Sequence, residues 1–94
     1  MNITGIIWLE DIVEKLAVKH SVGQDEVREV LRNAPRFQFV ESGHYPGENL
    51  YAALGQTDSG RYLIVYFVHK KDRRALVVSV RDMTRSERRH YENR

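Results

Sequence analysis

The sequence predicts an α+β domain in which an N-terminal helical hairpin packs on an antiparallel sheet of about four strands and a short basic helix follows. Three observations support this order. Apolar residues recur at three- and four-residue spacing before Pro35, and they alternate with polar residues in segments after it. A helix-start motif then follows the last alternating segment. The 94 residues fit one domain, residues 1–94.

Composition excludes several classes of protein. Apolar residues make up 41% of the chain and charged residues 30%, a globular balance rather than that of a disordered chain. The absence of cysteine excludes disulfides, thiolate zinc sites and a cysteine nucleophile. The longest apolar run, residues 62–68, is far shorter than the ~20 residues of a membrane helix, and the first residues do not resemble an export signal. We therefore expect a cytoplasmic protein with no membrane partner.

The first helix is predicted over residues 9–20, after a short apolar segment, residues 5–8, that has the composition of an opening strand. Five apolar residues follow helical spacing and form one buried face: Leu9, Ile12, Val13, Leu16 and Ala17. Extending that face by one turn reaches His20, which is therefore expected at the edge of the core.

A second helix is predicted before Pro35. Asp25 and Glu26 suit its first turn, where the helix macrodipole favours negative charge. Its inner face consists of Val27, Val30, Leu31 and Ala34. Only residues 21–23 connect the two helices, so we expect a hairpin whose apolar faces both need a sheet to cover.

Four segments predict the sheet. Residues 36–40 alternate between apolar and polar character, and Leu50, Ala52 and Leu54 recur at every second position of the next segment. Residues 62–68 are apolar on both faces, as expected for a central strand. The last strand is predicted over residues 75–81. In it, one face is expected to hold Leu76, Val78 and Val80. Turn-rich sequences between these segments predict antiparallel neighbours.

A short helix is predicted from Thr84. In the capping box of this helix, Thr84 caps the amide of Glu87 and the Glu87 side chain reaches back to the cap. Three basic residues share a face at three- and four-residue spacing: Arg85, Arg88 and Arg89. Tyr91 is the one core anchor, so little burial holds the helix and ligand binding is a candidate reason for its presence.

The net charge of +2 conceals an uneven distribution. Residues 1–60 hold 5 basic and 9 acidic side chains, a balance of −4, whereas residues 61–94 hold 10 and 4, a balance of +6. We expect the basic residues of the second part to adjoin in space: Lys70, Lys71, Arg73, Arg74, Arg81, Arg85, Arg88 and Arg89. They form either a solvated surface or a site for a polyanion, because arginine matches phosphate geometry.

RNA is the favoured polyanion. No helix-turn-helix pattern for duplex DNA is evident, and Tyr45, Tyr66 and Tyr91 offer stacking faces for unpaired bases or serve simply in packing. Nucleotide loops, serine elbows and zinc motifs are not evident either. The four histidines lie in different predicted elements without ligand spacing, so neither a metal nor a cofactor is predicted.

Short motifs run along nearly the whole chain: Trp8, residues 19–22 (KHSV), 26–27 (EV), 33–35 (NAP), 53–55 (ALG) and 60–61 (GR). The most specific is the stretch 79–84 (SVRDMT) with Glu87, Arg88 and Tyr91. In these motifs the sequence resembles the BrnT family of toxins from type II toxin–antitoxin modules. It departs from the family where Leu9, Ile12 and Leu16 replace polar residues, where Ser21 replaces a glycine, and where Leu76 replaces a basic residue.

The resemblance implies a RelE-like ribonuclease fold and a toxin that cleaves RNA, expected to be mRNA, and so inhibits translation and growth. It implies metal-independent cleavage by attack of the 2′-hydroxyl on the neighbouring phosphorus, without a cofactor. The catalytic residues would be His20, Lys19, Arg81 and Tyr91, and the RNA-binding residues Arg61, Arg74, Arg85, Arg88 and Arg89. The expected partner is a ribbon-helix-helix antitoxin like BrnA, and operator DNA would be bound only through the toxin–antitoxin complex.

Alternatives remain at this point. His20 has a reference pKa near 6.5 that suits acid–base chemistry, but its spacing equally fits a core-edge histidine bonded to a backbone carbonyl. The chain as a whole also fits a non-catalytic RNA- or ribosome-binding module, or a degenerate toxin homologue. A third hypothesis is a scaffold or dimerisation domain that does not bind nucleic acid. Its binding to a protein partner should not depend on salt concentration.

Overall fold

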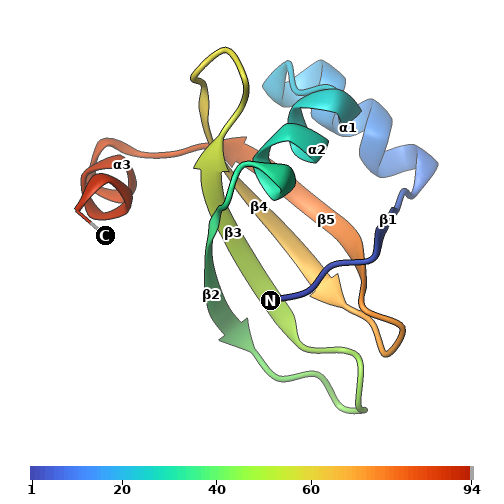
Figure 1. The fold of residues 1–94 in the computed structure, drawn as a ribbon. Coiled ribbons are helices and arrows are strands. Elements are labelled where there is room, and N and C mark those ends of the chain that lie inside the picture. Colours follow the sequence, from blue (N-terminus) through green and yellow to red (C-terminus); the bar gives the residue numbers. More distant parts are fainter. Residues whose placement is uncertain (94) are drawn as a thin grey trace.

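The computed structural model describes residues 1–93 and confirms an α+β domain. Its elements are, in order, β1 (Gly5–Ile7), α1 (Glu10–His20), α2 (Gln24–Arg32), β2 (Arg36–Glu41), β3 (Leu50–Gln56), β4 (Tyr62–His69), β5 (Arg74–Asp82) and α3 (Arg85–Glu92). The strands form one sheet in the order β1-β5-β4-β3-β2 (Figure 1).

The sheet is mixed and has five strands, which corrects the prediction of about four antiparallel strands. β2 to β5 pair antiparallel with their chain neighbours, but β1 pairs parallel with β5 over only three residues, from Gly5 opposite Arg74 to Ile7 opposite Leu76. A three-residue apolar segment carries no signal for its distant partner. Its pairing is therefore decided by tertiary packing, in which Ile6 and Trp8 lie against the core.

The two N-terminal helices cover one face of the sheet, as Figure 1 shows. α1 packs against β5, and α2 packs against β3 and β4. The core between helices and sheet includes Leu16, Val27 and Val30, packed with Val65 and Phe67. Each helix thus meets the sheet itself, and these contacts do not by themselves establish a paired helical hairpin.

A bulge in β5 corrects the predicted alternation of that strand. Tyr66 pairs with Ser79, but the next pair is Phe67 with Val77, so Val78 is an extra residue in the ladder. Because of this insertion, Ala75, Val77 and Val80 are all fully buried, whereas Leu76 and Val78 are only partly buried. The expected face of Leu76, Val78 and Val80 is therefore wrong.

α3 packs on the other face of the sheet, away from α1 and α2 (Figure 1). Its predicted capping box is confirmed: Thr84 Oγ1 accepts from the Glu87 amide at 3.1 Å, and Glu87 Oε1 accepts from the Thr84 amide at 2.8 Å. Tyr91 is 4% exposed and packs with Ala52, Leu54 and Ile64, which confirms it as the anchor of this helix.

Candidate functional site

The carboxyl end of β5 brings several of the predicted site residues together. Successive side chains of a strand point to opposite faces, and the last two residues of β5 follow this rule. Arg81 points toward α3, whereas Asp82 meets Arg61, which also contacts the end of α1 and the start of α2. The site therefore has two halves, one on each side of a single strand end.

On the α3 side, Arg81 forms a two-point ion pair with Glu87. Nη1 donates to Oε1 at 2.7 Å and Nη2 donates to Oε2 at 2.8 Å. Nη2 also donates to the Tyr66 hydroxyl at 3.1 Å, and the guanidinium lies 5.7 Å from the centre of the Tyr66 ring. Because the Arg81 side chain is still 35% exposed, this arrangement presents a fixed cation to solvent.

The charges of this pair shift both pKa values. The hydrogen bonds from Arg81 are the largest cause that lowers the pKa of Glu87 to about 2, and the amide of Thr84 adds to the effect. Glu87 in turn raises the pKa of Arg81. Both groups are therefore ionised at neutral pH, and the paired carboxylate partly neutralises the cation that the sequence assigns to phosphate.

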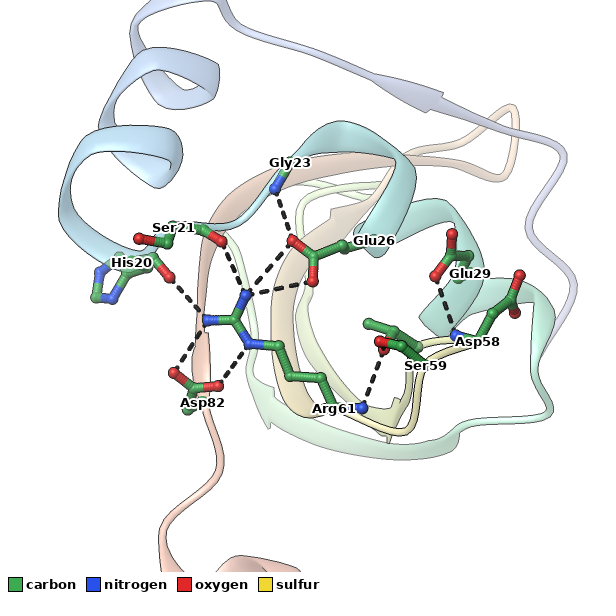
Figure 2. Close-up of polar contacts among 10 residues, drawn as sticks. His20, Ser21, Gly23, Glu26, Glu29, Asp58, Ser59, Arg61 and Asp82 are labelled. Atoms are coloured by element: carbon green, nitrogen blue, oxygen red, sulfur yellow. Dashed lines mark hydrogen bonds and ion pairs between the residues drawn. The ribbon is translucent and has the colours of Figure 1, made fainter.

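On the α1–α2 side, Arg61 is the centre of a cluster shown in Figure 2. Nε and Nη2 donate to the two oxygens of Asp82 at 2.8 and 3.1 Å. Nη1 and Nη2 donate to the backbone carbonyls of Ser21 and His20, each at 2.8 Å, and Nη1 also reaches both oxygens of Glu26 at 3.3 and 3.4 Å. Every nitrogen of the guanidinium is engaged, so the predicted contact of Arg61 with RNA has no free donor in this arrangement.

His20 and Lys19 end α1 beside this cluster. The imidazole of His20 is half-buried and points away from Arg61, while its carbonyl points toward it (Figure 2). Hydrogen bonds to Arg61 are the main cause that lowers the pKa of Asp82, and the charge of His20 lowers it further. Within residues 1–93, no hydrogen bond joins the His20 ring to a backbone carbonyl. The neighbouring Lys19 is exposed. The end of α1 thus places His20 near Asp82.

The remaining predicted residues divide between the two ends of the sheet. Arg85, Arg88 and Arg89 are exposed on α3, where Arg88 lies 4.0 Å from the centre of the Tyr62 ring and pairs with Glu92 at 3.8 Å. The turn of residues 70–73 and Arg74 lies at the opposite end of β5, roughly 25 Å away for a strand of this length.

The expectation that this turn adjoins Arg81 in space is therefore wrong. Sequence neighbours separated by a full strand lie at opposite ends of it. Arg74 is paired with Asp72 through a 2.7 Å contact instead.

Tyr91 and Tyr66 show what the sequence could not reveal. Tyr91 is buried, and its ring meets Tyr62 edge to face, so a direct role in the reaction stays a prediction. Tyr66 lies beside Arg81 because it pairs with Ser79 across the β4–β5 ladder, two residues before Arg81. The sequence indicates Tyr66 only as a stacking or packing residue, because its place beside Arg81 depends on the register of these strands, which the bulge at Val78 shifts.

The fold and the site define a small α+β domain with arginines displayed around one strand end, a construction suited to a polyanionic ligand. The model of the BrnT family, ribonuclease toxins of type II toxin–antitoxin systems, matches residues 8–87, and the chain belongs to this family. The matched region contains His20, Arg61, Arg81 and Glu87 and ends before Tyr91. No curated individual protein matches the chain.

Family membership makes the protein a ribonuclease toxin and implies an antitoxin partner. Two further searches concern the described residues alone. Nowhere in residues 1–93 do three or more His, Asp or Glu side chains gather as a metal site would require. None of the helices in the same residues has the length and apolar character needed to cross a bilayer.

Proposed function

We propose that the protein is a metal-independent endoribonuclease that cleaves mRNA in the cytoplasm, with RNA crossing the carboxyl end of β5. The observation that carries this proposal is the placement of Arg81 and the end of α1 on the two sides of one strand end within a chain of the BrnT family. The exposed arginines of α3 extend the same region and supply charge for the RNA backbone. Cleavage of mRNA would inhibit translation and growth.

The proposed reaction is an internal transesterification. The 2′-oxygen forms a bond to the adjacent phosphorus, the bond from phosphorus to the 5′-oxygen breaks, and the products are a 2′,3′-cyclic phosphate and a 5′-hydroxyl. His20 takes the proton of the 2′-hydroxyl, and Lys19 donates a proton to the leaving 5′-oxygen. Arg81 stabilises the charge that develops on the phosphorane. Tyr91 holds α3 on the sheet, beside this site.

Arg81 has one donor left for the phosphate. Its Nη1 and Nη2 hydrogens are taken by Glu87, Tyr66 and the Asp82 carbonyl, whereas its Nε–H has no protein acceptor among residues 1–93. A phosphate oxygen would bind at Nε, or it would displace Glu87 from the fork. Either route places the phosphate at the carboxyl end of β5, which the RNA crosses to reach His20 on the other side.

The proposed partner is a ribbon-helix-helix antitoxin like BrnA. We propose that it covers the basic face of α3 and the strand end, which would block RNA by occupying the same charges. The toxin–antitoxin complex, rather than the toxin, would then bind operator DNA.

Expression of the protein alone and with its neighbouring gene, followed by mapping of RNA ends, tests the proposal. His20→Ala and Arg81→Ala should each lower cleavage about a hundredfold per folded molecule. The melting temperature should stay near that of wild type in His20→Ala and fall in Arg81→Ala, which loses the ion pair with Glu87. His44→Ala, in an exposed loop, and Arg28→Ala, in an exposed ion pair with Asp25, are the matched controls. Cleavage should persist in excess chelator, and a strict requirement for a divalent ion would contradict the mechanism.

A second function is favoured by the Arg81–Glu87 pair. Because a carboxylate already occupies the Arg81 fork, the protein could bind RNA or the ribosome through the α3 arginines without cutting it. This alternative predicts RNA binding that weakens steeply with salt, and no cleaved ends. Binding that is independent of salt would exclude both functions.

A further inference from the structure

Arg61 contacts the end of α1, the start of α2 and the end of β5 through its guanidinium, and it makes more hydrogen bonds there than ligand binding would require. Its guanidinium has acceptors at all three nitrogens, and two of these acceptors are backbone carbonyls of the turn that ends α1 (Figure 2). Asp82 raises the pKa of Arg61 through a hydrogen bond, which is the largest cause of the shift. The side chain is 27% exposed and permanently charged. Such a group fixes the positions of its neighbours.

The segment that Arg61 holds is the one that carries His20. The last carbonyls of a helix have no partner within the helix, and Arg61 supplies one to both His20 and Ser21. Ser21 has a φ of 52°, a left-handed conformation that costs a non-glycine residue free energy. On the core side of the same turn, Val22 is buried and its amide donates to the Leu16 carbonyl at 3.1 Å. The turn is therefore fixed from both sides.

Arg61 also connects this turn to the strand of the catalytic arginine. Both oxygens of Asp82 accept from Arg61, and Asp82 directly follows Arg81 in β5. Glu26 completes the connection, because its carboxylate accepts from Arg61 and from the Gly23 amide at the start of α2. A single side chain thus relates the end of α1 to the end of β5.

We propose that Arg61 is a positioning residue, which sets the location of His20 relative to Arg81 for RNA cleavage. This inference rests on the proposed function of His20 and Arg81. We therefore do not assign Arg61 to the RNA phosphate, because a phosphate would have to displace the protein acceptors that already bind its guanidinium. Ser21 lacks the conformational freedom of glycine at its φ of 52°, which increases the need for such support.

Steady-state kinetics of five variants on one RNA substrate tests the proposal. Arg61→Ala should lower kcat about tenfold to a hundredfold with little change in KM, because misplacing His20 affects the reaction more than binding. Arg61→Lys, which keeps one charged donor, should recover part of that loss. The double variant His20→Ala/Arg61→Ala should be no slower than His20→Ala alone. Arg32→Ala, which removes an exposed arginine pair with Asp58, is the matched control and should retain wild-type kcat.

Two kinetic outcomes would overturn the proposal. A rise in KM with a smaller salt dependence of RNA binding would make Arg61 a phosphate contact. A lowered melting temperature with unchanged kcat per folded molecule would make it a structural residue alone. If Arg61→Ala does not fold, Arg61→Lys provides the same comparison.

A measurement without RNA separates this inference from the proposed function. The imidazole proton resonance of His20, identified by its loss in His20→Ala, should shift in Arg61→Lys and stay in place in Arg32→Ala. An unchanged resonance in Arg61→Lys would refute positioning even in an active toxin. Conversely, wild-type protein that does not cleave RNA would refute the proposed function, while the resonance would still report whether Arg61 positions His20.

Discussion

Arg81 and Glu87 join the end of β5 to the first turn of α3 through two parallel hydrogen bonds of 2.7 and 2.8 Å. The same Glu87 carboxylate completes the capping box of α3. One carboxylate therefore serves both the start of the helix and its attachment to the sheet, and its ionisation should be visible in the stability of the protein.

The pair predicts an acid-dependent loss of stability. The pKa of Glu87 is lowered to about 2 in the folded protein from an ordinary value of 4.5, so its contribution is fully present above pH ~5 and is lost as the pH falls from 4.5 toward 2. Partly exposed pairs are screened by solvent, so we expect about 1 to 2 kcal/mol. Denaturant unfolding of wild type and Glu87→Gln from pH 7 to 2 should show a difference in unfolding free energy that disappears at the acid end. Glu14→Gln, at an exposed position of α1, controls for the removal of a carboxylate. A difference in unfolding free energy between wild type and Glu87→Gln that persists at pH 2 would contradict the prediction.

Glu87→Gln should also strengthen RNA binding. Without the carboxylate charge, the Arg81 fork is available to phosphate, and the affinity for a noncleavable RNA should rise by about fivefold or more. Glu14→Gln changes the net charge equally and should have a smaller effect. Titration at two salt concentrations measures both variants. Weaker binding by Glu87→Gln would show that Glu87 orients Arg81 for RNA rather than competing with it.

Tyr66→Phe should reduce RNA cleavage by about fivefold, the equivalent of ~1 kcal/mol for one hydrogen bond that orients Arg81. The variant keeps the ring under the guanidinium and removes the hydroxyl that accepts from Nη2. Tyr62→Phe is the matched control, because it removes a hydroxyl that donates to Glu92 at 2.9 Å instead. Tyr62→Phe should cleave RNA at the wild-type rate. An equal loss of cleavage in both variants would show that the Tyr66 hydroxyl has no specific role in orienting Arg81.

Gly55→Val should destabilise the domain by about 1 to 3 kcal/mol through overpacking. A Cβ atom at Gly55 would lie 3.1 Å from Val30 Cγ1 and 3.2 Å from Pro35 Cβ, where α2 packs on β3. Gly23→Ala adds a methyl group with no atom within 4 Å, but Gly23 is the N-cap of α2, where alanine is disfavoured, so we expect a smaller loss of at most about 1 kcal/mol. Thermal unfolding compares the two, and a Gly55→Val protein as stable as Gly23→Ala would show that α2 has room to move.

The sequence predicts the helices and strands better than it predicts how the strands pair. Apolar spacing located both N-terminal helices, and the capping box at Thr84 located α3, because these signals are local. The pairing of β1 with β5 and the bulge at Val78 depend on contacts between distant residues, which spacing does not encode. The opening strand was therefore expected while its parallel partner was not.

The candidate site shows the same division. Residue type and motif predict the arginines and His20 as candidates, but they do not reveal the acceptors of Arg61. Glu26 lies 35 residues from Arg61, and the Ser21 carbonyl lies 40 residues from it, so no local pattern connects them. Without those partners, the sequence assigned Arg61 to RNA, whereas the structure surrounds it with protein acceptors.

The two faces of the sheet are covered unequally, because α1 and α2 pack on one face and only the short α3 packs on the other. This difference should affect which part of the domain unfolds locally. α3 has eight residues, shorter than a helix that is stable alone, and is held by Tyr91 and a few polar contacts. Its amide protons should therefore exchange with solvent through local detachment, at a lower free energy than those of β3 to β5, which exchange only when the whole domain unfolds. The face of the sheet beneath α3 thus becomes transiently accessible in an otherwise native protein.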